Sequence, residues 1–317
     1  MGTDTRPIRL WILHDHKPGH TSQLHGLANR IVTLGEVPGQ VEVRWVDATL
    51  LKATRLDWVM KRWPESDFSE PPDIVTGAGS ASHVLILLAR RVFGCMASVI
   101  MRPSIPLFLY DAAIVPRHDR PPVRNNILIT RGVMNTLLPR PADAQPTAHT
   151  MLIGGISKHF EWSSPQIIEQ IKIVLNAAPD VQWVITSSRR TPEDFRPLLL
   201  AEKLPQVQFY SHNETPRGWL PEQLRQSAQV WVTPDSVSMV YEAITSGAAT
   251  GLFSLEPLQH GRIHEGLDEI LALKLYTPFE SWQTSRQLPP PREQLWEAER
   301  GARWLLEMYT RWRKRHS

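Results

Sequence analysis

An aspartate and a histidine lie close together where an apolar run gives way to a helical pattern. The run 8–13 ends just before Asp15, and Pro18-Gly19 then turns the chain so that His20 projects from the start of the helix. A histidine titrates near neutral pH and can deprotonate an attacking hydroxyl, while Asp15 orients it or serves as the base instead. The pattern indicates acid–base chemistry of the kind that sugar transfer needs. The alternative is structural, with His20 only starting a helix and Lys17 a solvated charge.

A second turn in the first half follows the run that ends at Thr76. Gly77-Ala78-Gly79-Ser80 opens an apolar helical pattern, which is the right context for a turn that faces phosphate or sugar. Gly79 and Ser80 are therefore candidate substrate contacts. Glycines at such a turn equally serve close packing, and the full dinucleotide fingerprint is absent.

Two turns in the second half suit an anion. Gly154 and Gly155 follow the run 151–153 and expose N–H groups, to which Ser157 and Lys158 add a hydroxyl and a cation for a diphosphate. The spacing is not that of a Walker A loop, which argues against ATP hydrolysis. The next run ends in Thr186-Ser187-Ser188-Arg189-Arg190-Thr191, where Ser188 and Arg189 are the candidates because they lie nearer the strand.

A third turn of the second half lies at 233–243. Asp235 and Ser236 stand at a helix start, where the N–H groups of Ser236 and Ser238 can hold a phosphate. Glu242 lies two turns into that helix and can accept hydrogen bonds from ribose hydroxyls. The structural alternative is an N-cap aspartate and a solvated glutamate.

These turns need parallel strands to position them. Strands alternating with helical patterns predict a parallel sheet in each half of the chain, hence an α/β protein with two Rossmann-like domains facing across a cleft. The predicted strands are 8–13, 41–46, 73–76, 98–101, 112–115, 126–130, 151–153, 181–186, 207–210, 230–233 and 251–254. The clearest helices are 165–178, 192–203 and the stripe Leu24, Leu27, Ala28 and Ile31. The run 84–89 is apolar on all sides, so we expect a buried helix there.

Proline-rich stretches suggest the domain limits. Residues 139–146 indicate a linker, so we expect an N-terminal domain at 1–140 and a C-terminal domain at 148–285. Pro289-Pro290-Pro291 precedes a final helical pattern, which makes 286–317 a helix that packs back on the lobes.

Composition narrows the class of protein. The chain has 317 residues, of which 42% are hydrophobic, enough for two cores. A formal charge of +3 is too small to argue for nucleic acid, and a single cysteine, Cys95, suits a reducing compartment. His14, His16 and His25 lack a metal-binding spacing, so we predict no metal. The first residues lack a long apolar segment, so we expect a cytoplasmic protein, at most peripheral on the inner membrane.

Five ordered motifs resemble the mitochondrial-fission Elm family and its bacterial relatives. They are DxKPGHxxQ at 15–23, PRHDR at 116–120, IGGxSKHFxW at 153–162, TSSRRTP at 186–192 and PDSVSM at 234–239. The resemblance runs from about residue 8 to 279. It implies the GT-B class of glycosyltransferases, with the nucleotide-sugar donor on the C-terminal lobe, the acceptor on the N-terminal lobe and no obligatory cofactor or metal.

The resemblance also assigns roles to residues. On the acceptor side it implies Lys17, His20 and Gln23, close to Gly19, with His118 and Asp119 bordering the cleft. On the donor side it implies Gly155, Ser157, Lys158, Ser188, Arg189, Asp235, Ser236, Ser238 and Glu242. We therefore expect transfer of a sugar to a glycan or lipid-linked acceptor, for example in assembly of lipopolysaccharide or another cell-envelope glycan.

Two alternatives remain at this point. Tryptophan is interleaved with lysine and arginine in residues 50–63 and again in residues 304–315. Such a mixture suits binding to anionic lipid headgroups. A core helix with a basic outer face, followed by a solvated tail, gives the same pattern. A non-catalytic membrane-associated scaffold that recruits a dynamin-like or other partner is the second hypothesis. A sugar-nucleotide epimerase or phosphorylase on the same two-lobed frame is the third.

Overall fold

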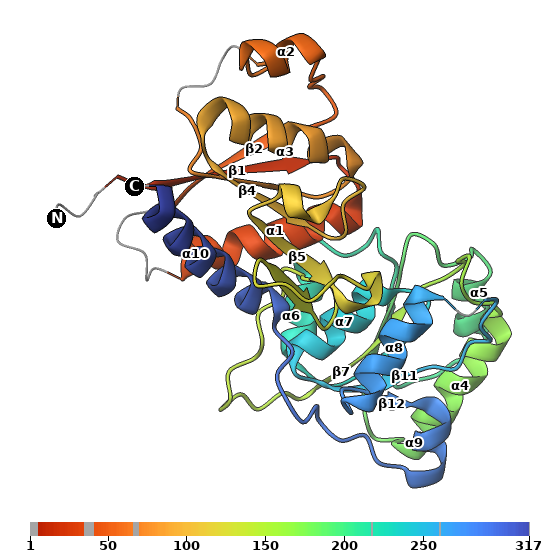
Figure 1. Cartoon of the computed structure of the whole chain (residues 1–317). Coiled ribbons are helices and arrows are strands. Elements are labelled where there is room, and N and C mark those ends of the chain that lie inside the picture. The colour runs from red at the N-terminus through yellow and green to blue at the C-terminus, as the bar shows by residue number, and fades with distance from the viewer. Residues whose placement is uncertain (1–5, 35–40, 66–69, 217, 260, 317) are drawn as a thin grey trace. The chain divides into compact units, whose positions relative to one another are not determined.

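The chain folds into two compact units. The computed structural model describes residues 6–34, 41–65, 70–216, 218–259 and 261–316. The first unit comprises residues 1–136 and 296–317, and the second comprises residues 137–295 (Figure 1).

The first unit is built on a six-stranded parallel sheet with the order β2-β1-β3-β4-β5-β6. Its strands are β1 (Ile8–His14), β2 (Val41–Asp47), β3 (Ile74–Gly77), β4 (Met96–Ile100), β5 (Ala112–Pro116) and β6 (Ile127–Thr130). Successive side chains of a strand point to opposite faces, so Leu10 and Ile12 enter one core while Trp11 and Leu13 enter the other. All six predicted strands are confirmed within two residues at each end.

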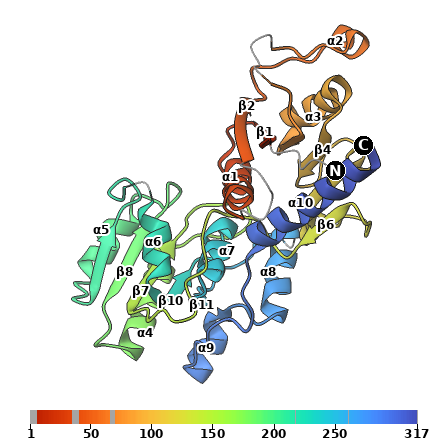
Figure 2. The ribbon, with the colours of Figure 1, turned by 90° about the vertical axis from the view of Figure 1, so that its left-hand side faces the viewer.

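Helices cover both faces of this sheet. They are α1 (Pro18–Thr33), α2 (Arg55–Met60), α3 (Ser80–Phe93) and α10 (Glu297–His316), with short 3-10 turns η1 (Leu107–Leu109) and η2 (Arg117–Asp119). The helices α1 and α10 lie side by side on one face and α3 lies on the other (Figures 1 and 2). The predicted stripe of α1 is buried as expected. The expectation of a fully buried helix at 84–89 is wrong in one respect, because Val84 is 41% exposed on the outer side of α3.

The second unit has a sheet of the same kind, with the order β12-β11-β10-β7-β8-β9. Its strands are β7 (Ala148–Ile153), β8 (Trp183–Ser187), β9 (Val207–Tyr210), β10 (Ser227–Val232), β11 (Ala249–Leu252) and β12 (Thr277–Pro278). Its helices are α4 (Ser164–Ala177), α5 (Phe195–Ala201), α6 (Trp219–Arg225), α7 (Val237–Ser246), α8 (Arg262–Ala272) and α9 (Phe279–Ser285). The helices α4, α5 and α9 contribute to one core, and α6 and α7 contact β10. The predicted class, α/β with two Rossmann-like domains of the GT-B kind, is confirmed.

The segments near the unit limits differ from the sequence-based boundaries. The proline-rich stretch 139–146 belongs to the second unit, where the Arg140 guanidinium donates to the carbonyls of Ser227 (2.8 Å) and Gly247. The segment 286–317 is divided, because residues from Trp296 onward join the first unit. There α10 buries its apolar side on α1, and Arg30 pairs with Glu299 at 2.6 Å. A helical stripe shows that a helix packs, but not on which sheet.

No helix in the described part of the chain is both long and apolar enough to span a bilayer.

Candidate functional site

The strand order of the first unit reverses between β1 and β3, although all six strands are parallel. The chain leaves β1 toward β2 on one side and continues through β3 to β6 on the other, so the loops that follow β1 and β3 diverge at their carboxyl ends. Parallel sheets bind ligands at such a switch point. The loop after β1 carries Asp15, and the loop after β3 carries Gly79.

Asp15 and His20 form a hydrogen-bonded pair at this switch point. His20 Nδ1 lies 2.9 Å from Asp15 Oδ1 and 3.0 Å from Oδ2, and the Asp15 side chain is only 4% exposed. Burial alone would raise the pKa of Asp15, but hydrogen bonds from His20 and the Lys17 backbone outweigh it and hold that pKa below its ordinary value. The ionised carboxylate favours the tautomer with the proton on Nδ1, which leaves the Nε2 lone pair of His20 to accept a proton.

Gly79 makes room for the pair. A Cβ atom at Gly79 would lie 2.3 Å from Asp15 Oδ2 and 2.7 Å from His20 Nδ1, closer than any real side chain approaches. Its φ of +88° also belongs to the region that favours glycine. The glycine therefore brings the start of α3 against the acid–base pair, and contact of this turn with a substrate stays a prediction.

His83 joins this cluster, although its sequence pattern alone did not predict a place in the site. It is buried one turn into α3, and its Nδ1 accepts from the Ser104 backbone N–H (3.4 Å) and lies 3.1 Å from Ser104 Oγ. Burial lowers the pKa of His83, and the electrostatic interaction with His20 lowers it further, while Asp15 opposes both. A neutral imidazole thus stands beside the pair. Its signal was a histidine inside an apolar helix just after Gly79.

The other candidates of the first unit vary in their distance from the pair. Lys17 Nζ lies 3.4 Å from Asp15 Oδ2, whereas the Gln23 side chain is buried and donates to the Gly19 carbonyl at 3.3 Å. Gly19 and Ser80 are exposed. His118 and Asp119 lie in η2, after β5 and thus two strands away from β3, and their part in the site stays a prediction.

The second unit has its switch point between β7 and β10. The Gly154 N–H donates to Thr233 Oγ1 (2.8 Å) and the Gly155 N–H to Asp235 Oδ2 (2.9 Å), which joins the loops after these two strands. A Cβ atom at Gly154 would lie 2.3 Å from both Asp235 carboxylate oxygens. The two glycines therefore allow the buried carboxylate to approach the backbone, and this part of the predicted turn is structural.

Arg190, rather than Arg189, is built into this loop cluster. Its guanidinium pairs with Asp235 Oδ2 (2.8 Å) and donates to the Ile156 carbonyl (2.9 Å). Burial raises the pKa of Asp235, and hydrogen bonds from Gly155 and Arg190 oppose that rise. Arg189 is exposed and has no partner among the described residues.

Basic side chains gather at the carboxyl ends of the strands of the second sheet, near the loops just described. Burial lowers the pKa of His159, and electrostatic interactions with Lys158, His264 and Arg190 lower it further, so these four groups share one region. Ser157 Oγ accepts from the His159 and Phe160 N–H groups, both at 3.2 Å, which shapes the turn. Such a concentration of positive charge suits a phosphate or diphosphate. In the described part of the chain no three potential ligands converge on a metal position.

The remaining donor-side candidates are split between structural and exposed positions. Ser188 Oγ donates to the Gly154 carbonyl (2.8 Å), so its hydroxyl holds the loop. Ser236 caps α7 without a side-chain bond to the helix, and Ser238 is exposed. Glu242 is partly buried, has no partner among the described residues, and desolvation raises its pKa to about 7. An unpartnered, desolvated carboxylate is suited to accept hydrogen bonds from a ligand.

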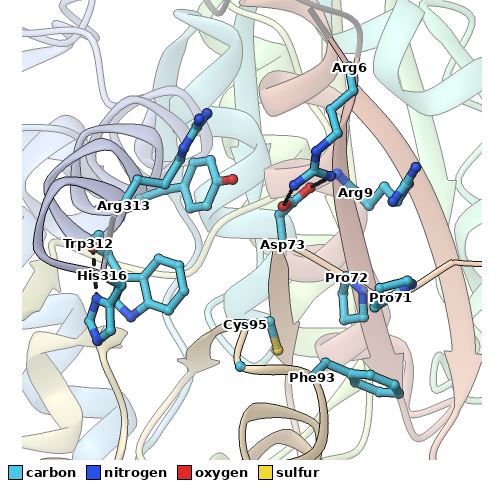
Figure 3. A pocket seen from close by; sticks show the side chains of 12 residues that line it. Arg6, Arg9, Pro71, Pro72, Asp73, Phe93, Cys95, Trp312, Arg313 and His316 are labelled. Carbon is cyan, nitrogen blue, oxygen red and sulfur yellow. Dashed lines mark hydrogen bonds and ion pairs between the residues drawn. The ribbon is translucent and has the colours of Figure 1, made fainter. Parts of the chain in front are cut away.

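A cavity of about 410 Å³ lies at the amino-terminal ends of the strands of the first sheet, between these ends and the C-terminal end of α10 (Figure 3). Arg6 donates to both oxygens of Asp73 at 3.0 and 2.7 Å, and Trp312 and Arg313 of α10 line the other side. Because the acid–base pair lies at the carboxyl ends of the strands, this cavity is not part of the candidate site.

Comparison by sequence identifies one family. The model of the family described as mitochondrial fission ELM1 matches residues 18–309, which includes His20, begins just after Asp15 and covers most of both units. A search of curated proteins found no match.

Solved structures of three nucleotide-sugar epimerases share the fold. The UDP-GlcNAc 2-epimerase from Neisseria meningitidis, bound to UDP-GlcNAc, has a TM-score of 0.58 at 11% identity, over 96% of this chain and 100% of that one. A putative UDP-N-acetylglucosamine 2-epimerase from Listeria monocytogenes reaches 0.57 at 11%, over 93% and 94%. The enzyme from Methanocaldococcus jannaschii reaches 0.55 at 10%, over 95% and 100%. At these identities the likeness shows the fold alone.

Proposed function

This chain belongs to the mitochondrial fission ELM1 family, and we propose that it is a metal-independent GT-B glycosyltransferase. It would move a sugar from a nucleotide-sugar donor to a glycan or lipid-linked acceptor, such as a precursor of lipopolysaccharide or another cell-envelope glycan. The proposal includes a cytoplasmic location.

The observation that carries the proposal is the Asp15–His20 pair at the switch point of the first sheet. Because the carboxylate holds the proton on Nδ1, His20 Nε2 can take the proton of an acceptor hydroxyl as its oxygen attacks the anomeric carbon. The imidazolium that forms is then stabilised by Asp15. Lys17, whose Nζ lies 3.4 Å from the same carboxylate, would contact the acceptor.

The second unit supports the donor side of the proposal. The basic group of Lys158, His159 and Arg190 would bind the diphosphate and stabilise it as it leaves, together with N–H groups at the start of α7. Glu242 would accept from the ribose hydroxyls. UDP-GlcNAc is the first donor to test, because the Neisseria meningitidis structure of the same fold holds it.

A panel of nucleotide-sugars tests the donor assignment. We expect one or more to bind by calorimetry, with at least tenfold weaker binding in Lys158→Ala and Glu242→Ala because each removes a charged or hydrogen-bonded contact. His20→Ala should abolish transfer while it keeps donor binding. If no nucleotide-sugar binds, the proposal fails and the non-catalytic scaffold, which needs none of these residues, is the better explanation.

Epimerisation is the second candidate, because the three solved structures named above are 2-epimerases. The two reactions differ in what they require. An epimerase converts the nucleotide-sugar when it is the only substrate, whereas a transferase releases nucleotide in step with a glycosylated acceptor. Chromatography of the nucleotide-sugar after incubation without acceptor therefore distinguishes them.

A further inference from the structure

The helix α2 presents an apolar face to solvent. Leu56, Val59 and Met60 follow the i, i+3, i+4 spacing that places side chains on one side of a helix, and Val59 and Met60 are 73% and 67% exposed. Asp57 is buried on the other side of the helix, and Trp58 packs against the core of the first unit. Three large apolar side chains thus project together from a helix of six residues.

This face is held firmly in place. Thr54 and Asp57 form a capping box at the start of α2, and the buried Asp57 carboxylate pairs with Arg62 at 2.8 Å. From α3, Arg91 Nε donates to the Trp58 carbonyl at 2.7 Å. The apolar side chains are therefore exposed on a helix that side-chain contacts hold in position.

A groove lies between α2 and α3, which neighbour each other (Figure 1), and the α2 segment lines it with Trp58 and Lys61 rather than with Leu56, Val59 and Met60. It has a volume of about 510 Å³ and contains Leu87 and Leu109 among its lining residues, and Phe108 next to it is also exposed. We call the side chains of Leu56, Val59 and Met60 the α2 surface. Apolar surface gathered in one place on a soluble unit marks a site of interaction.

Positive charge surrounds the α2 surface. Its cations are Lys52, Arg55, Lys61, Arg62, Arg90 and Arg91. The nearby acids are Asp57, which is paired with Arg62, and Asp111, which is paired with Arg90 at 3.0 Å. The six cations and two acids leave a net charge of +4.

We propose that the α2 surface docks the first unit on an anionic phospholipid bilayer. The apolar side chains of α2 enter the boundary between headgroups and acyl chains, and the surrounding lysines and arginines contact the lipid phosphates. The tryptophans that drew attention in the sequence are not the anchors, because Trp63 is buried and Trp58 packs against the core. Trp304 and Trp312 near the chain end pack against the other core of the unit.

Vesicle sedimentation of the full chain tests the proposal. We expect the protein to bind phosphatidylcholine vesicles that contain phosphatidylglycerol, to bind pure phosphatidylcholine much less, and to dissociate as salt rises from about 0.05 to about 0.5 M. The double variant Val59→Asp with Met60→Asp should bind at least about tenfold more weakly, because the inserted side chains become charged.

The matched control carries the same change in charge at other exposed positions. Val123 and Leu200 are 90% and 57% exposed, and Val123→Asp with Leu200→Asp should bind vesicles within about twofold of the native chain. Equal loss in both double variants would show that overall charge alone governs binding and would overturn the proposal.

Two further outcomes would also refute it. One is a native chain that sediments with neither kind of vesicle. The other is a dimer, seen by light scattering, that only Val59→Asp with Met60→Asp dissociates, which would assign the surface to a second copy. The His20→Ala variant should bind vesicles like the native chain, so this proposal can hold even where the proposed transfer fails.

Discussion

Asp15 and His20, the two candidate catalytic residues, leave no room for a side chain at position 79. The change Gly79→Ala puts a methyl group against Asp15 and His20 and strains a backbone at φ +88°. We expect the free energy of unfolding to fall by about 1–3 kcal/mol and transfer to fall at least a hundredfold, since the base moves away from the acceptor hydroxyl. Urea denaturation and a transfer assay measure the two effects.

Gly94 supplies the control for that change. It also has positive φ, +65°, but a Cβ atom there would meet nothing within 4 Å. Gly94→Ala should therefore cost about 1 kcal/mol from backbone strain and leave transfer within about twofold of the native rate. Native transfer by Gly79→Ala would contradict the role given to the pair.

Glu242 makes stability depend on pH. Its pKa in the folded protein is about 7, above the ordinary 4.5, so the folded state binds more protons between these values and the free energy of unfolding falls as pH rises from 4.5 to 7. The change Glu242→Gln removes this decrease in the free energy of unfolding, because glutamine does not ionise. The variant should be more stable than the native protein by up to about 3 kcal/mol at pH 8 and nearly equal to it at pH 4. Denaturation curves of both proteins at pH 4 and pH 8 test this prediction. An equal difference in stability between variant and native protein at the two pH values would contradict a raised pKa of Glu242.

Single residues were predictable from sequence where a turn exposes them. His20 was found because it follows Asp15 and a Pro-Gly turn, and the structure pairs the two. The place of His83 in the site was not predictable, because a histidine within an apolar helix gives the same sequence pattern whether it faces a site or a core. Arg190 was passed over for Arg189, since the curvature of a loop decides which of two adjacent side chains points inward.

At the scale of elements, Arg190 joins the loop after β8 to the loop after β10. Arg190→Ala leaves the fully buried Asp235 side chain without its cation, and we expect the free energy of unfolding to fall by about 1–3 kcal/mol. Arg189→Ala removes an exposed side chain and should change it by less than about 0.5 kcal/mol. Equal effects of the two changes in urea denaturation would show that the ion pair does not hold these loops.

Central strands such as β3, β4 and β5 were predictable because each is a short apolar run buried on both faces of a parallel sheet, whereas the edge strands β2 and β9 are only partly buried. The structure confirms β9 at the predicted residues and extends β10 by three residues toward the N-terminus. Short helices such as α2, α6 and α9 were not predicted, because six or seven residues give too few turns for a clear apolar stripe. Their place is set by tertiary packing.

At the scale of the molecule, the chain crosses between the two units twice, near residues 136 and 296. The second unit is continuous in sequence, whereas the first needs α10 to cover α1 and the core beneath it. Leu305 and Ala302 are fully buried there. The two units therefore differ in what a truncated chain can form.

We predict that residues 137–295 fold alone and carry donor binding. This fragment holds a complete six-stranded sheet, its covering helices and the basic group near Lys158. It should unfold in one cooperative urea transition and bind the donor within about threefold of the full chain, without catalysing transfer. Residues 1–136 alone should not fold cooperatively, because the missing α10 exposes the core face of α1, and adding residues 296–317 as a separate peptide should restore the transition. A folded 137–295 fragment that binds no nucleotide-sugar, beside a full chain that does, would show that donor binding needs residues of the first unit.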